Sequence, residues 1–105
     1  MRDKKSSFGE FIRKLRHDRE EPLRVIAAAV GIDSTLLSKL EHGDRFPTEA
    51  QISKFAKFFK VPEQEVKGRV IADKVTSEYD DDEATLHAAH ILRERAMPYK
   101  TNNSK

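Results

Sequence analysis

The stretch Ala27-Ala-Ala-Val-Gly31-Ile-Asp-Ser-Thr-Leu-Leu37-Ser-Lys-Leu-Glu41-His-Gly43 decides the fold of this chain. Ala27 has no bulk, so a second helix can cross close above it. Gly31 tolerates the positive φ that a helix C-terminus and a tight turn demand. Leu37 is expected to fill the corner between the two helices from inside. The pattern predicts two helices at a steep angle, with the second exposed where it can enter a DNA major groove.

The composition indicates a small, charged, helical protein. Of the 105 residues, 37% are hydrophobic and 36% are charged, while glycine and proline number only four each. So few turn residues argue against an all-β design, and we expect an all-α fold. The lack of cysteine excludes a disulfide framework, thiol catalysis and a cysteine-based zinc site. No apolar run approaches the ~18 residues of a membrane helix, and no secretory signal pattern is present, so we expect a cytoplasmic protein.

Charge is unevenly distributed along the chain. Residues 1–62 hold 13 Lys/Arg against 9 Asp/Glu, a net +4, whereas residues 63–105 hold 7 against 9, a net −2. A basic first part and an acidic last part fit a DNA-facing module joined to a segment that avoids DNA. Chance variation in a charged surface is the alternative explanation for so small a difference.

Apolar residues recur at helical spacing through most of the chain. Start signals include Asp33, the capping box Thr48-x-x-Gln51 and the acidic run 80–82, while Gly31 and Gly43 mark helix ends. We therefore expect helices at about 8–20, 22–30, 34–41, 48–59, 62–77 and 83–96.

Several spaced motifs match one known family together. They are Phe8-Gly-Glu-Phe-Ile-Arg-Lys-Leu-Arg16, the Ala27/Gly31/Leu37 triad, Leu37-Ser-Lys-Leu-Glu-His-Gly43 and Pro47. On these residues the chain resembles the lambda-repressor-like, or xenobiotic-response-element (XRE), family of helix-turn-helix transcriptional regulators. The extra C-terminal helices look most like regulators of the restriction–modification controller type. The resemblance implies a five-helix DNA-binding domain at 8–68. Outside it, the residues themselves predict a flexible N-terminus at 1–7, a helical extension at 69–97 and a flexible tail at 98–105.

The resemblance also implies roles for individual residues. The front of the third helix reads base edges in this family, at positions that correspond here to Ser34, Thr35, Ser38 and Lys39. Short hydroxyls can bond to several bases, and lysine can donate to guanine O6 and N7. The alternative is an ordinary solvated helix face whose hydroxyls bond back to their own helix.

Other positions correspond to structural and phosphate-binding groups of the family. Arg16 and Glu41 resemble its buried ion pair between the first and third helices. Such a pair orients the helices more than it stabilises them, because desolvation offsets much of the Coulomb gain. Phosphate contacts are expected from Arg24, His42, Gly43 and Arg45. Many members of the family anchor a phosphate with a glutamine where this chain has Leu23, so that anchor is lost or moved to Arg24.

The last expected helix has two distinct faces. Its broad apolar face must pack on something, and a second copy of the chain is attractive because operators of such regulators are usually two-fold. Packing within a monomer is the alternative. The residues expected at a dimer interface are Val70, Val75, Ala88, Ile91 and Leu92.

The opposite face carries the row Glu83, His87, His90 and Glu94, spaced so that all four lie on one side of a helix. Histidine and carboxylate at this spacing can bind a divalent metal. A solvated polar face with weak i,i+4 pairs is the favoured interpretation, so we expect no metal and no cofactor.

The sequence therefore predicts a dimeric, sequence-specific DNA-binding regulator, a repressor or autoregulator of a two-fold operator. An antitoxin, or another protein that masks a partner with its C-terminal helices, is the alternative. No nucleophile–base constellation or phosphate-cradling glycine loop is apparent, so we do not expect an enzyme.

Overall fold

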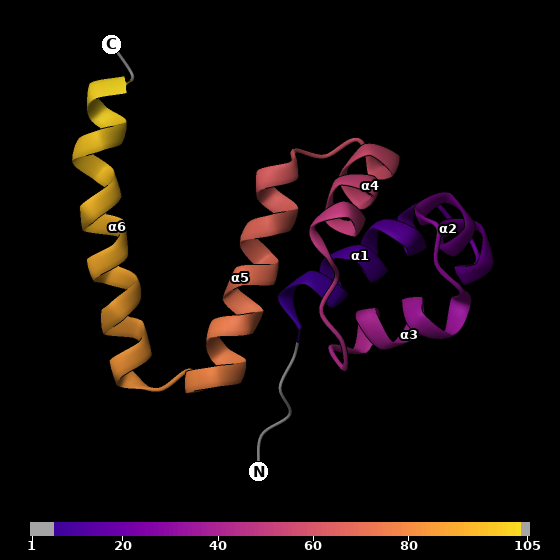
Figure 1. Cartoon of the computed structure of the whole chain (residues 1–105), viewed down its shortest axis with the longest axis horizontal. Coiled ribbons are helices and arrows are strands. Elements are labelled where there is room, and N and C mark those ends of the chain that lie inside the picture. The colour runs from indigo at the N-terminus through magenta and orange to yellow at the C-terminus, as the bar shows by residue number, and fades with distance from the viewer. Residues whose placement is uncertain (1–5, 104–105) are drawn as a thin grey trace. The chain divides into compact units, whose positions relative to one another are not determined.

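The computed structural model describes residues 6–103, with side chains through residue 96, and shows an all-α chain (Figure 1). No strand occurs within these residues, which confirms the expected fold class. In the described range, no helix is long and apolar enough to cross a membrane. The helices are α1 (Ser7–Asp18), α2 (Leu23–Val30), α3 (Ser34–His42), α4 (Glu49–Phe59), α5 (Glu63–Tyr79) and α6 (Glu83–Asn103).

Local sequence signals set the helix ends. Gly31 and Gly43 end α2 and α3 in the left-handed region, at φ 80° and 83°, where an L side chain would be strained. The Asp33 side chain caps α3 by accepting from the Leu36 amide at 2.7 Å. Thr48 and Gln51 form a reciprocal capping box at α4. These caps confirm the turns and helix starts that the sequence predicts.

The chain divides into two compact units, the first ending at Lys74 and the second beginning at Val75. The first unit has one continuous apolar core. Leu37 is fully buried in it, and the rings of Phe8 and Phe55 meet edge to face at 5.4 Å. Burial of these side chains holds α1 to α4 and the first part of α5 together in one unit. The core comprises Phe8, Ile12, Ile26, Ala27, Val30, Leu37, Leu40, Ile52, Phe55, Ala56, Phe59, Val66 and Val70.

The first unit extends further along α5 than expected. We expected a boundary after residue 68 and a dimer contact at Val70, but Val70 is 2% exposed and belongs to the core. Gly68, which suggested the boundary, lies within α5 with open space around it. Val70 joins this stretch of α5 to the core, and Asp73 joins it to the start of α1.

A buried carboxylate on α5 caps the N-terminus of α1. Asp73, 8% exposed, accepts hydrogen bonds from the Ser6 hydroxyl at 2.7 Å, the Ser7 amide at 2.7 Å and the Phe8 amide at 3.0 Å. The Ser6 hydroxyl also accepts from the Gly9 amide at 2.8 Å. The expected flexible segment 1–7 is therefore wrong for residues 6 and 7, while residues 1–5 lie outside the described range.

The second unit consists of the last turn of α5 and the whole of α6. Asp82 starts α6 by accepting from the Thr85 amide at 3.0 Å. We expected a flexible tail from residue 98, but α6 continues through Pro98 to Asn103. A proline removes one backbone donor from a helix. The turns on either side of Pro98 continue the helix although that hydrogen bond is missing. Residues 104 and 105 lie outside the described range.

Candidate nucleic-acid interface

The corner between α2 and α3 forms as its residues predict. Ala27 is 2% exposed, and its carbonyl accepts from the Ile32 amide at 2.9 Å, which closes the turn around Gly31. Leu37 fills the inside of the corner. Because the inner face of α3 is fully used in packing, its opposite face is left to meet a partner.

Four predicted base-reading residues share this outer face of α3. Thr35 and Lys39 are exposed, while Ser34 and Ser38 are half-buried. At about 100° per residue, these positions and His42 fall within about 140° of the helix circumference. The structure thus brings together one lysine and three hydroxyls, all capable of bonding to base edges.

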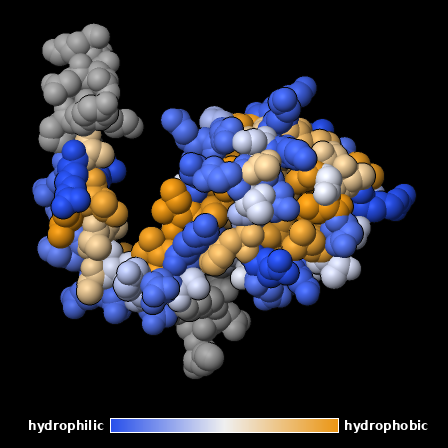
Figure 2. All heavy atoms as spheres, in the orientation of Figure 1, coloured by the Kyte–Doolittle hydropathy of each residue, from blue (hydrophilic) through white to orange (hydrophobic). Residues whose placement is uncertain are grey.

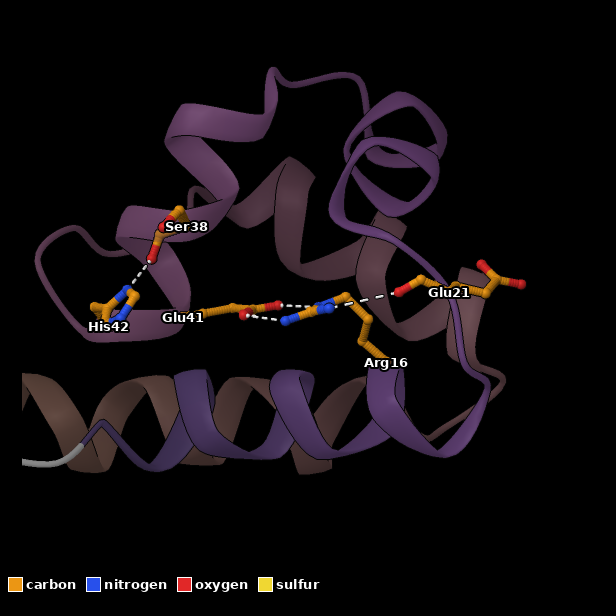
Figure 3. Close-up of polar contacts among 5 residues, drawn as sticks. All are labelled: Arg16, Glu21, Ser38, Glu41 and His42. Carbon is orange, nitrogen blue, oxygen red and sulfur yellow. Dashed lines mark hydrogen bonds and ion pairs between the residues drawn. The ribbon is translucent and has the colours of Figure 1, made fainter.

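The His42 ring has a fixed hydrogen-bond partner. Its Nδ1 lies 2.8 Å from the Ser38 carbonyl oxygen (Figure 3). A carbonyl oxygen only accepts, so Nδ1 carries the hydrogen in this arrangement. The exposed ring then has Nε2 available, which accepts when the imidazole is neutral and donates when it is protonated. A contact from Nε2 to a phosphate oxygen needs the protonated form.

An ion pair ties α3 to α1. Arg16 Nε lies 2.9 Å from Glu41 Oε2, and Arg16 Nη2 lies 3.0 Å from Oε1, a bidentate geometry (Figure 3). The side chains are 15% and 5% exposed. The hydrogen bond to Glu41 raises the pKa of Arg16 against the opposing effect of its burial. The pair expected from the family resemblance is thus formed, and it joins α1 to α3.

Gly9 permits a close approach between α1 and α3 that the sequence alone does not predict. A Cβ atom there would lie 2.8 Å from the Leu40 carbonyl oxygen and 2.7 Å from the Glu41 carbonyl carbon. Real Cβ atoms essentially never come that close to backbone. Gly9 lies inside the matched motif 8–16, but its spacing alone does not say which helix crosses there.

The expected phosphate-binding groups lie in two places. Arg24 is the second residue of α2 and is exposed. Leu23, where many relatives have the glutamine anchor, is half-buried against the core and supplies packing. Gly43 and Arg45 are exposed in the loop that follows α3. The same loop exposes Phe46, which belongs to none of the motifs described above.

The predicted polar row on α6 is solvent-exposed. Glu83, His87, His90 and Glu94 are all exposed, and His90 Nε2 lies 3.4 Å from Glu94 Oε2. Across the described residues, no group of three or more histidine, cysteine or acidic side chains could hold a metal ion.

Apolar side chains lie on the second unit as well. Ile91 and Leu92 are 41% and 60% exposed, and Figure 2 shows apolar residues in orange along α6. A hollow of about 360 Å³ lies between the end of α5 and α6. Its lining residues are Val75, Tyr79, Asp82, Ala84, Thr85, Ala88 and Leu92. Four of the five predicted dimerisation residues therefore belong to this unit, and Val70 does not.

Comparison with known proteins agrees with this geometry. Residues 7–67 match the family described as helix-turn-helix domain. The chain is 30% identical over 98 residues to the HTH-type transcriptional repressor RghR of Bacillus subtilis (strain 168), covering 92% of this chain and 70% of that protein. It is 41% identical over 58 residues to the HTH-type transcriptional regulator RghRB of the same organism, covering 54% of this chain and 42% of that protein. The chain belongs to the helix-turn-helix family of XRE-like, DNA-binding transcriptional regulators.

Proposed function

We propose that the protein is a sequence-specific repressor that binds a two-fold operator as a homodimer. The observation that carries this proposal is the outer face of α3, where Ser34, Thr35, Ser38 and Lys39 are brought together above a fully packed inner face. The similarity to the repressor RghR covers 98 residues, so it extends beyond the helix-turn-helix domain. Both observations support repression through an occupied operator.

The interface separates residues that read sequence from residues that hold the backbone. Lys39 is exposed on the outer face of α3, at a position that faces base edges when the helix lies in a major groove. Arg24 lies in the first turn of α2 and Arg45 in the loop after α3, and both guanidinium groups are exposed and able to bind phosphate oxygens. Phosphate contacts contribute affinity for any duplex, whereas base contacts discriminate between duplexes.

The second unit supplies the proposed dimer contact. Ile91 and Leu92 expose apolar surface that association would remove from water. A two-fold dimer would place two α3 helices on half-sites about one turn of DNA apart. Binding both half-sites together raises affinity well above that of one unit alone.

A selection from random DNA duplexes tests the central proposal. We expect enrichment of a two-fold motif, and Lys39→Ala should lose about 1–3 kcal/mol of binding free energy and relax preference at one position of each half-site. Arg45→Ala should weaken binding to all duplexes alike. It should also reduce the slope of log binding constant against log salt concentration by about one. Binding without sequence preference that disappears at modest salt would refute sequence-specific regulation.

The dimer is tested separately by sedimentation. Ile91→Asp should give monomers and much weaker operator binding. Leu86→Asp is a matched control because Leu86 is 63% exposed and lies about 140° from Ile91 around α6. If Ile91→Asp remains dimeric, the contact lies elsewhere. If the native protein instead co-purifies with a different polypeptide and selects no DNA motif, a partner-masking role is favoured.

A further inference from the structure

Lys74 on α5 lies beside the loop that follows α3. Its Nζ is 5.7 Å from the centroid of the Phe46 ring, within the range of a cation–π contact. Phe46 is 42% exposed and directly follows Arg45. A cation from α5 is therefore placed next to a residue proposed to bind phosphate.

Neighbouring contacts fix α5 against this loop. Ser6, which donates to Asp73, lies so close to Gly43 that a Cβ on this glycine would come within 2.9 Å of the Ser6 Cβ. The end of α3, the N-cap of α1 and this turn of α5 therefore meet at one place.

The ammonium group of Lys74 is held in place by Phe46, but its charge is not neutralised. Lys67, two turns earlier on α5, lies 3.2 Å from the Glu49 carboxylate. Among the described residues, Lys74 forms no ion pair with a carboxylate, and its contact is with the face of the Phe46 ring. An aromatic face attracts a cation without cancelling its charge, so the ammonium can still bind an anion.

We propose that the DNA-backbone interface continues from the loop after α3 onto α5, with Lys74 as a phosphate-binding residue held in place by Phe46. This inference rests on the proposed function, because it requires DNA at α3. Lys74 and Arg45 then hold the DNA backbone from two different elements. The interface is thereby wider than the helix-turn-helix corner.

The test compares duplex binding by wild type, Lys74→Gln and Lys67→Gln as salt rises from 50 to 200 mM. Each phosphate contact makes the binding constant fall by about a further 3.5-fold over this range. Wild type, with one contact more, should therefore lose about 3.5-fold more affinity than Lys74→Gln. The effect should be equal for operator and unrelated duplexes. Lys67→Gln removes the same charge from the same helix and should keep the wild-type slope. Equal slopes for wild type and Lys74→Gln would overturn the inference.

Two further variants complete the test. Arg45→Gln reports on the proposed function independently: if it flattens the slope and Lys74→Gln does not, only the Lys74 inference fails. If wild type binds no duplex, the proposed function fails instead. Phe46→Leu should weaken binding in wild type but add nothing in the Lys74→Gln background, because the ring acts through the lysine. Fully additive effects would refute the role of Phe46.

Discussion

Replacement of Asp73 by alanine removes the carboxylate that joins α5 to the start of α1. The change takes one acceptor from the Ser6 hydroxyl and leaves the amides of Ser7 and Phe8 without their partner. These amides are the first two of α1, which no intrahelical carbonyl can satisfy. Phe8 is 1% exposed, so water cannot easily replace the carboxylate there.

The expected cost follows from these contacts. A buried donor left unsatisfied costs about 1–3 kcal/mol, and the loss of negative charge at a helix N-terminus adds about 0.3–1 kcal/mol. Ser7 is half-buried, so its amide regains part of its hydrogen bonding from water. We therefore expect Asp73→Ala to lower the free energy of unfolding of the first unit by about 3 kcal/mol, a large share of the ~5–15 kcal/mol typical of a domain.

Urea unfolding followed by the methyl NMR signals of Ile12 and Val66 measures this effect, because both side chains lie in the core of the first unit. Asp73→Asn keeps one accepting oxygen and should cost about half as much. Asp18→Ala is the control, since Asp18 pairs with Lys14 on the exposed face of α1 and should cost at most about 0.5 kcal/mol. If Asp73→Ala costs no more than Asp18→Ala, the proposed capping role is wrong.

Three other substitutions probe the packing around α3 by the same urea assay. Gly9→Ala should cost at least about 1–3 kcal/mol, because its Cβ would collide with the α3 backbone; a neutral effect would refute the close approach. Glu41→Ala should lower the free energy of unfolding by about 3–5 kcal/mol, because it leaves the Arg16 charge unpaired. The double variant Glu41→Ala/Arg16→Leu should recover part of this loss, and additive losses would contradict the reasoning. Leu37→Ala should cost about 2–5 kcal/mol, and a value near zero would contradict its full burial.

Features that depend on local spacing are predictable from the sequence. The left-handed turns at Gly31 and Gly43, the Asp33 cap and the capping box at Thr48 are each set within a few residues. Helical periodicity likewise identifies the buried stripes of α1 and α4. For this reason the corner that presents α3 could be predicted with its individual residues.

Features that join distant parts of the chain are not predictable in this way. Asp73 and Ser6 are 67 positions apart, and no local pattern relates them. Val70 fits either a dimer contact or a core position by periodicity, and only its burial in the core of the first unit decides between them. The Phe46–Lys74 contact likewise depends on how distant parts of the chain pack, and no local pattern predicts it. The base-reading residues could be placed on one face, while their contacts to DNA remain predictions.

The capping of α1 by Asp73 has a consequence for how the protein is made. During synthesis α1 to α4 leave the ribosome first, and the matched family region ends at residue 67. At that point Val70 and Asp73 are still missing, so the N-terminus of α1 and part of the core stay open to water. The first unit therefore gains the stability of this cap and of this part of its core only once the turn of α5 that contains Asp73 has left the ribosome.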